Sequence, residues 1–365
     1  MQRPQYKLKS QNSDREHKLI QSKIIFFRCD ASLTIGSGHV MRCLTLAICL
    51  REAGHRCYFI CQDLPGSLCD HIYISGFKCF VLEKRFFEDC LLSDNSSLQK
   101  LQQIDAELTT EIIIKVDRRP DLLVVDHYLL DRRWQTICKQ RVETILVIDD
   151  LADRQHDCQF LLDQNYYTNA TLRYKNLTSA GCQHFTGPEF MLLRDEFFTN
   201  YEDKKTEGIF VSFGGVDRHD MTFLIVNELL QSFPEIKIQA VIGAYYSGKV
   251  RSLIDNSPQL EIYQSVEGIG EIMSSCKLSI GAGGATIFEK QSLGLASIAY
   301  SVADNQRQTL IDLHKGSFIK YLGHYDTFDA DELSLVINNF LQGKLKMRVL
   351  NIQDGKRKLI KEIIG

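Results

Sequence analysis

The chain has 365 residues, of which 24% are charged, and its formal net charge is −3. This balance argues against a basic nucleic-acid-binding protein and a disordered chain, and 44% hydrophobic residues suit a globular protein with full cores. No apolar run approaches the ~20 residues that span a bilayer. We therefore expect a cytoplasmic protein whose partners include neither nucleic acid nor a membrane.

The first 22 residues are polar and mixed in charge, and they lack the apolar core of a secretory signal. Residues 1–22 are predicted to form a flexible leader, with a basic docking arm as the alternative. The 12 cysteines show no Cys-x-x-Cys spacing, so paired zinc-ligand spacing is absent. Their scatter through apolar segments is typical of buried thiols in a reducing compartment.

Short β-rich runs then alternate with amphipathic runs, which is the pattern of parallel sheets covered on both faces. In a first domain, 23–200, strands are predicted at 24–29, 57–61, 78–82, 122–126, 144–149 and 160–162. In a second domain, 207–345, strands are predicted at 208–212, 237–242, 260–263, 278–280 and 296–300. Residues 346–365 are predicted as a C-terminal helix. The expected fold is α/β, with two Rossmann-like, doubly wound domains facing each other across a cleft.

The stretch Gly36-Ser37-Gly38-His39 lies between an apolar strand and a segment with helical spacing. A turn of this kind places backbone N–H groups at the start of a helix, where they can bind a phosphate. An imidazole there can exchange a proton near neutral pH, so His39 is a candidate general base. The alternative is that His39 is an ordinary first-turn residue and that the glycines only permit close packing.

Polar residues also follow later strands of the first domain, at the edge where such sheets bind ligands. Asp126 ends one strand and is predicted either to face the cleft or to cap a turn, and Tyr128 is predicted to contact substrate. The acids of 149–153 could bind a metal or act as acid and base, but capping and pairing with Arg154 is favoured. Residues 163–165 are further candidates for the cleft.

The second domain carries two glycine turns after strands, Gly214-Gly215 and Gly283-Gly284. Exposed N–H groups at the second turn could cradle a diphosphate. Glu289, early in the next helix, could reach ribose hydroxyls or only complement the helix dipole. The pair Asn305-Gln306 follows another strand, where an N-cap at Asp304 is the alternative role.

Three common motifs are absent from the sequence. It contains no Gly-x-x-x-x-Gly-Lys-Ser/Thr, and its first loop does not complete Gly-x-Gly-x-x-Gly because Met41 stands at the third glycine position. It also contains no Gly-x-Ser-x-Gly. These absences disfavour a P-loop ATPase, a dinucleotide oxidoreductase and a serine hydrolase of that type.

Several of these stretches together resemble the nucleotide-sugar hydrolases of pseudaminic acid biosynthesis, the UDP-2,4-diacetamido-2,4,6-trideoxy-β-L-altropyranose hydrolases, and the related spore-coat polysaccharide proteins. In the first domain the resemblance rests on 28–32, 36–43, 126–128, 148–154, 162–165 and 187–194. In the second domain it rests on 213–217, 281–286 with Glu289, and 305–306. The second-domain glycines are shared with UDP-GlcNAc transferases, so they identify the fold better than the reaction.

The resemblance implies a GT-B fold that holds UDP mainly in the second domain, with no cofactor and no metal. Water would attack the anomeric carbon with inversion and expel UDP, and His39 would be the general base. Tyr128 would contact the sugar, and Glu289 and Asn305 would hold nucleotide or substrate. The other matched positions expected to bind substrate are Asp30, Gly36, Gly38, Arg42, Asp126, Gly214, Gly215, Gly283, Gly284 and Gln306.

The leader and the insertion 84–116, with its long polar helix, depart from the family pattern and leave the exact sugar open. A GT-B glycosyltransferase, which passes the sugar to an acceptor, is the main alternative function. A non-catalytic nucleotide-sugar-binding protein is another, but it would not need His39. The oligomeric state also stays open.

Overall fold

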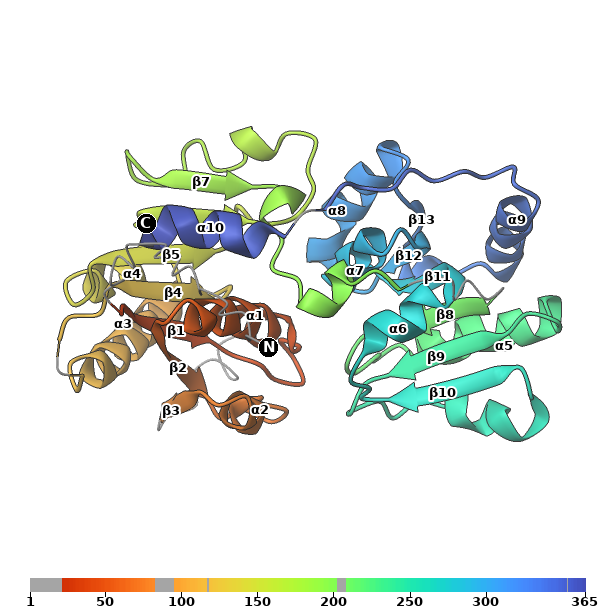
Figure 1. The fold of residues 1–365 in the computed structure, drawn as a ribbon, viewed down its shortest axis with the longest axis horizontal. Helices are drawn as coiled ribbons and strands as arrows, with labels where there is room; N and C mark the ends of the chain where they lie inside the picture. The colour runs from red at the N-terminus through yellow and green to blue at the C-terminus, as the bar shows by residue number, and fades with distance from the viewer. Residues whose placement is uncertain (1–21, 83–94, 117, 202–207, 353) are drawn as a thin grey trace, which may run out of the picture.

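A computed structural model of the protein describes residues 22–82, 95–116, 118–201, 208–352 and 354–365. The chain forms two α/β domains that lie side by side along the longest axis of the molecule (Figure 1). Nearly all of the predicted leader, most of the expected domain boundary at 200–207 and the first part of the 84–116 insertion lie outside the described residues.

The N-terminal domain is built on seven parallel strands in the order β3-β2-β1-β4-β5-β6-β7. They are β1 (Ile24–Cys29), β2 (Arg56–Gln62), β3 (Lys78–Leu82), β4 (Leu122–Asp126), β5 (Thr144–Ile148), β6 (Phe160–Asp163) and β7 (Gln183–Thr186). Every residue of β1 and β4 is buried because both faces of the sheet are covered. The strand order reverses between β1 and β4, which is the point where open α/β sheets bind ligands.

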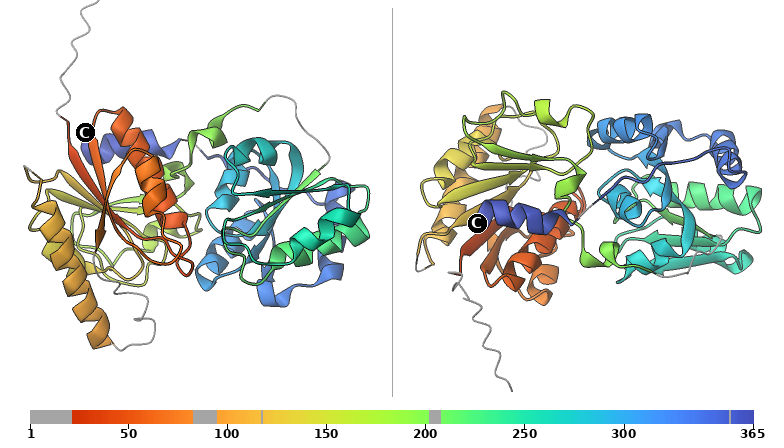
Figure 2. Two further views of the ribbon diagram at one scale, coloured as in Figure 1. Left: turned by 90° about the horizontal axis from the view of Figure 1, so that it is seen from below. Right: turned by 45° about the horizontal axis from the view of Figure 1, so that its top comes forward.

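Helices cover both faces of this sheet (Figure 2). They are α1 (Gly38–Glu52), α2 (Cys69–Ile74), α3 (Asn95–Ile113), α4 (Arg132–Cys138) and, from the end of the chain, α10 (Gly355–Ile364). Leu359 and Ile363 of α10 are buried in the cluster formed with α1 on one face. The C-terminal helix therefore returns to the first domain, as the blue ribbon shows in Figure 1.

The C-terminal domain repeats the architecture with six parallel strands in the order β10-β9-β8-β11-β12-β13. They are β8 (Gly208–Ser212), β9 (Ile238–Ile242), β10 (Leu260–Gln264), β11 (Cys276–Ala282), β12 (Ala296–Ser301) and β13 (Lys320–His324). Its helices are α5 (Met221–Ser232), α6 (Ile269–Ser274), α7 (Thr286–Ser292), α8 (Asp304–Lys315) and α9 (Ala330–Leu341). Short 3-10 helices lie at Ala170–Leu172, Pro188–Phe190, Asp195–Phe198, Val250–Asn256 and Tyr325–Thr327.

The predicted fold class is confirmed, and each predicted strand is present within two residues of its expected ends. The prediction omitted β7, β13 and α9. The two strands are edge strands with a single fully buried residue each, Phe185 and Leu322, so they lack the apolar run that marks the central strands. Residues 346–352 precede α10 without regular structure, so the C-terminal helix is shorter than expected.

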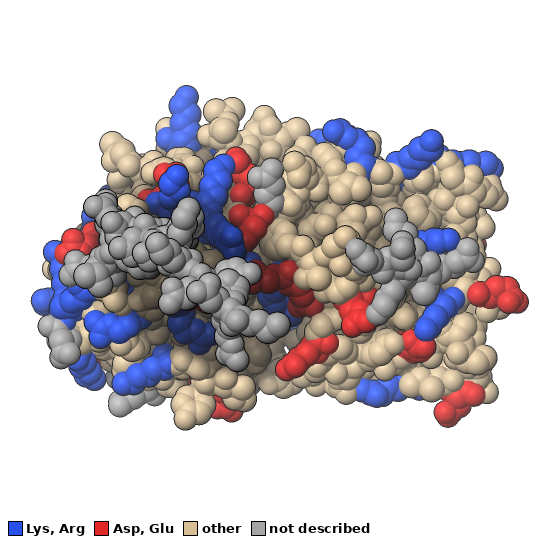
Figure 3. All heavy atoms as spheres, in the orientation of Figure 1, with Lys and Arg blue, Asp and Glu red and all other residues tan. Residues whose placement is uncertain are grey.

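Among the described residues, no helix combines the length and the apolar character that crossing a membrane requires. On the face shown in Figure 3, Lys and Arg side chains are mixed with Asp and Glu side chains, and acidic side chains gather near the junction of the two domains. The polar groups of most interest lie inside that junction.

Candidate active site

The loop between β1 and α1 brings His39 and Arg42 to the carboxyl edge of the first sheet. Ser32 shapes this loop, because its Oγ accepts hydrogen bonds from two loop N–H groups at 3.0 and 3.1 Å. Gly36 has a φ of +84°, a conformation that favours glycine. His39 and Arg42 are three residues apart in α1, so both side chains lie on the helix face that meets the sheet edge.

Asp126, the last residue of β4, joins these two side chains. It is fully buried and accepts hydrogen bonds from Arg42 Nε at 2.5 Å and Nη2 at 2.6 Å. Its Oδ1 also contacts Nδ1 of His39. Burial alone would raise the pKa of Asp126, but the Arg42 guanidinium and the His39 ring hold it well below its usual value. Asp126 is therefore a permanent carboxylate behind the imidazole.

A second carboxylate, Asp150, follows β5 and holds the other end of Arg42. Arg42 Nη1 lies 2.9 Å from both of its oxygens. Asp150 also accepts hydrogen bonds from Tyr128 Oη at 3.0 Å and from Asn165 Nδ2 at 2.8 Å. Burial, and then the charge of Asp150, raise the pKa of Tyr128, so the phenol stays a proton donor.

His39 and Tyr128 face a cavity of about 430 Å³ between the domains. Their rings meet edge to face with centroids 4.4 Å apart. The lining residues are Ser32, Thr34, Ile35, His39, Leu64, His127, Tyr128, Leu129, Leu151, Ala303 and Asn305. Asn305, from α8 of the second domain, donates from Nδ2 to Tyr128 Oη at 3.2 Å. Because Nδ1 of His39 contacts Asp126, Nε2 is the nitrogen available to a molecule in this cavity.

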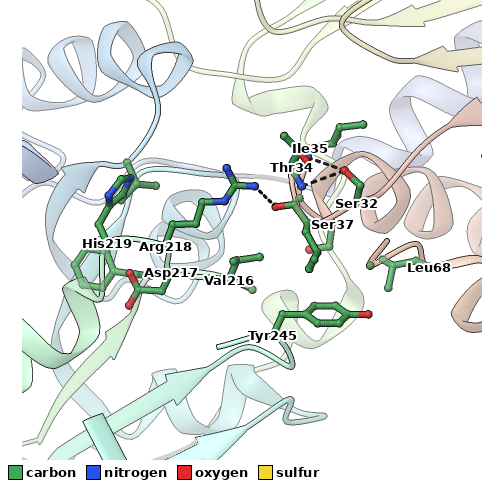
Figure 4. Close-up of a pocket in the computed structure, with 16 residues that line it drawn as sticks. Ser32, Thr34, Ile35, Ser37, Leu68, Val216, Asp217, Arg218, His219 and Tyr245 are labelled. Atoms are coloured by element: carbon green, nitrogen blue, oxygen red, sulfur yellow. Dashed lines mark hydrogen bonds between the residues drawn. The ribbon is translucent and has the colours of Figure 1, made fainter. Parts of the chain in front are cut away.

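A neighbouring cavity of about 220 Å³ lies between the first loop and the Gly214-Gly215 turn (Figure 4). Arg218 crosses it and donates from Nη2 to the carbonyl oxygen of Leu33 at 2.6 Å. Tyr245 lies on the second-domain wall and Leu68 on the first-domain wall. The two domains thus meet around two adjoining hollows, one beside His39 and one beside the first glycine turn.

The glycines of the second domain divide into two groups by what a side chain would meet there. A Cβ at Gly281 would lie 2.1 Å from the Ser212 carbonyl oxygen, and one at Gly283 would lie 2.3 Å from a Leu310 methyl. Packing alone therefore requires glycine at positions 281 and 283. A Cβ at Gly284 or Gly215 would have nothing closer than 3.8 Å. Packing gives no reason for glycine at these two positions, and close approach of a ligand would.

Nine predicted binding residues line neither of the two cavities: Asp30, Gly38, Arg42, Asp126, Gly214, Gly283, Gly284, Glu289 and Gln306. Asp30, Glu289 and Gln306 are instead held by contacts within the protein. Asp30 is 1% exposed, and its carboxylate is held by Arg28 at 2.7 Å in a buried layer that also contains Asp105. Glu289 lies 3.5 Å from Arg194, and burial raises its pKa. Gln306 accepts a hydrogen bond from the N–H of Val302 at 2.9 Å. Their roles in binding stay predictions.

The structure brings together five of the predicted residues, His39, Arg42, Asp126, Tyr128 and Asn305, and adds two others. Asp150 was assigned with its neighbours to capping and pairing, and Arg154 does pair with Asp149 at 2.7 Å and Asp153 at 2.8 Å. Asp150 instead turns toward Arg42. The position of Asp150 after β5, the neighbour of β4, is the sequence feature that could have predicted its place in the site. For Arg218 the sequence offers only its position shortly after the Gly214-Gly215 turn.

Comparison with known proteins finds similarity between this chain and nucleotide-sugar enzymes, although no protein-family model matches the chain. The UDP-2,4-diacetamido-2,4,6-trideoxy-β-L-altropyranose hydrolase of Campylobacter jejuni is 24% identical over 301 residues, covering 80% of this chain and 97% of that protein. The chain is a distant relative of this hydrolase. The relationship expected from the motifs is thereby confirmed at the level of a distant family.

Two further relatives extend the comparison. An uncharacterized protein of Methanocaldococcus jannaschii is 22% identical over 300 residues, and the match spans 78% of this chain but only 57% of that protein's length. The spore coat polysaccharide biosynthesis protein SpsG of Bacillus subtilis is 25% identical over 134 residues, which are 34% of this chain and 39% of that protein.

Solved structures identify the fold as GT-B. MurG of Acinetobacter baumannii aligns with a TM-score of 0.58 at 14% identity, over 92% of this chain and 95% of that chain. LpCGTa in complex with UDP aligns with a TM-score of 0.66 at 14% identity, over 94% and 98% of the two chains. At these identities the likeness shows the fold alone.

Proposed function

We propose that the protein is an enzyme acting on a UDP-sugar, and that it hydrolyses the bond between the sugar and UDP. The observation that carries the proposal is the contact of His39 Nδ1 with the buried carboxylate of Asp126, at the wall of the interdomain cavity. The distant hydrolase relative supports the reaction, and its name supplies the proposed substrate, UDP-2,4-diacetamido-2,4,6-trideoxy-β-L-altropyranose.

The proposed base is His39. Asp126 accepts a hydrogen bond from Nδ1–H, which leaves the lone pair of Nε2 directed to the cavity. A water molecule between Nε2 and the anomeric carbon would lose its proton to the ring as its oxygen forms the new bond to carbon. Asp126 would hold the ring in this orientation and lie beside the positive charge that the step creates.

The proposed leaving group is UDP, whose bond to the anomeric carbon breaks as the water attacks from the opposite side. The developing charge on its diphosphate needs hydrogen-bond donors at the second-domain edge of the cleft. Backbone N–H groups at Gly215 and Gly284 are suitable, because both positions are open to a close ligand. Tyr128 and Asn305 would orient the sugar between these turns and the base.

A glycosyltransferase is the second candidate. CalG4, the calicheamicin glycosyltransferase, has the same fold, with a TM-score of 0.60 at 12% identity. The same base could take a proton from an acceptor hydroxyl instead of water. The two candidates differ only in what occupies the space beside Nε2 of His39.

Phosphorus NMR of the purified protein with the proposed substrate, in EDTA and without an acceptor, separates these candidates. Release of free UDP is expected, with the sugar appearing in the inverted anomeric form by proton NMR. His39→Gln should bind UDP without releasing it from substrate, whereas His71→Gln, an exposed histidine of α2, should be fully active. A protein that binds UDP but releases none without an acceptor would favour the transferase.

A further inference from the structure

Three cysteines from different elements meet at the edge of the N-terminal domain. Cys61 is near the end of β2, Cys69 begins α2 and Cys79 lies in β3. The register pairs Phe59 with Cys79, so Cys61 and Cys79 lie diagonally on the same face of adjacent strands. The three Sγ atoms all lie within 4.8 Å of one another.

This spacing suits a metal ion better than a disulfide. With metal–sulfur bonds of about 2.3 Å, tetrahedral zinc holds its sulfur ligands roughly 3.8 Å apart, so side-chain rotations of small amplitude would complete the site. Thiolates select soft ions such as Zn²⁺ over Mg²⁺ or Ca²⁺. A disulfide would use two of the sulfurs and leave the third without a function.

The surroundings permit loading of such a site. Cys61 is 2% exposed, whereas Cys69 and Cys79 are half-buried, which leaves a path for an ion from solvent. Binding would displace the thiol protons.

We propose that Cys61, Cys69 and Cys79 bind one Zn²⁺ or a similar soft ion, with a fourth position left to water or another small ligand. This inference does not depend on the proposed function. The chain segment between two of the ligands, 62–68, forms part of the cleft wall. Leu64 lines the cavity beside His39, and Leu68 lines the neighbouring one (Figure 4).

The ion would therefore fasten both ends of a segment that shapes the cleft. The middle of this segment is already tied to the first loop, because Leu33 donates its N–H to the Pro65 carbonyl oxygen at 2.8 Å. A Cβ at Gly66 would lie 2.9 Å from Leu33. A bound ion at both ends and the Leu33 contact in the middle give the segment one fixed position beside the cleft.

The test uses the full-length, reduced, metal-free protein. Titration with Zn²⁺ against a chromophoric chelator, with native mass spectrometry for stoichiometry, should show one ion per chain. Cys69→Ser and Cys79→Ser should each weaken Zn²⁺ binding by more than the ~10–100-fold that loss of a supporting outer residue costs. Cys49→Ser, which alters a half-buried cysteine of α1 outside the cluster, should bind Zn²⁺ like the unaltered protein.

Circular dichroism and UDP binding check that each variant is folded. Equal Zn²⁺ binding by the unaltered protein, Cys69→Ser and Cys79→Ser would overturn the proposal. So would a protein that binds no Zn²⁺ and, after mild oxidation, loses two hydrogens with a mapped bond between two of the three cysteines. That result would identify a thiol–disulfide pair in place of a metal site.

Discussion

The two domains share one topology but present opposite kinds of surface to the cleft. The edge of the first sheet carries side-chain chemistry, with Arg42 held between Asp126 and Asp150 and His39 against Asp126. The edge of the second sheet presents glycine turns, where backbone N–H groups are the available donors. A doubly wound sheet can therefore place either ionisable side chains, suited to proton transfer, or glycine turns, suited to anion binding, at the same topological position.

The buried charged side chains beneath the two sheet edges differ in whether they have charged partners. Under the first, Arg28 pairs with Asp30 and Asp105, so each buried charge has a partner. Under the second, the fully buried Lys290 has no hydrogen-bond partner among the described residues, and burial lowers its pKa to about 8. Pairing preserves charge in the first domain, whereas burial disfavours it in the second.

The largest expected effect on turnover comes from a substitution at the carboxyl edge of the first sheet. His39→Gln removes the proposed base, so turnover should fall by the ~10²–10⁴-fold typical of general-base loss. The dissociation constant of UDP, measured by calorimetry, should stay within about twofold, because the nucleotide is assigned to the other edge. Loss of UDP binding together with turnover would contradict the assignment of proton transfer to the first sheet edge and nucleotide binding to the second.

A second prediction concerns the pH dependence of the first edge. Burial and the charge of Asp150 raise the pKa of Asp163 to about 7. A group whose folded pKa lies above its unfolded value stabilises at low pH, and this contribution is lost as pH rises from about 4 through 7. Its size is on the order of 4 kcal/mol, from a rise of about three pKa units at about 1.4 kcal/mol each.

Asp163→Asn removes this titration. The difference in unfolding free energy between the unaltered protein and Asp163→Asn, from urea denaturation, should therefore decrease between pH 5 and pH 8. Asp70→Asn, at an exposed carboxyl of α2, should show a constant difference over the same range. A constant difference for Asp163→Asn as well would contradict the prediction.

The third prediction tests the second edge. A Cβ at Gly284 would meet only the Gln306 side chain, at an ordinary contact distance of 3.8 Å. The melting temperature of Gly284→Ala should therefore be unchanged, while UDP binds about 10-fold more weakly or worse. Gly281→Ala forces a Cβ against the Ser212 carbonyl oxygen and should lower the melting temperature instead. Unchanged UDP affinity in Gly284→Ala would remove this turn from the nucleotide site.

The smallest expected effect on kinetics comes from the hydrogen bond that joins the two domains across the cleft. Asn305→Ala removes the hydrogen bond to Tyr128 across the cleft, which is worth about 0.5–1.5 kcal/mol. We expect a rise in KM of roughly 2–10-fold and little change in kcat. Steady-state kinetics beside Asn256→Ala, an exposed position in the same domain, would measure it. A fall in kcat with constant KM would place Asn305 in the chemical step.

Sequence patterns predicted the central strands because full burial on both faces requires continuous apolar runs, as in Leu122–Asp126. They also predicted that Asp126 and His39 share one edge, since parallel strands place their carboxyl ends together. They did not predict that Asp150 would turn to Arg42 while Asp149 turned to Arg154. Adjacent residues of one loop differ in direction by backbone angles that no spacing rule encodes.

The sequence pattern did not predict the cysteine cluster, for a related reason. Spacing rules for zinc ligands detect pairs within one turn, whereas Cys61, Cys69 and Cys79 meet only through strand register and the start of α2. The glycines posed the opposite difficulty, because the sequence could not separate those required by packing from those that leave room for a ligand.

The return of α10 to the first domain has a consequence for how the chain folds during synthesis. Leu359 and Ile363 complete a core whose other members begin with Ile25. The first domain therefore remains incomplete until residues 355–364 leave the ribosome, whereas the second domain has all its strands and helices earlier. In topological terms the second domain is an insertion within the first. A nascent chain arrested before residue 355 should expose an apolar groove beside α1 even while its second half is fully folded.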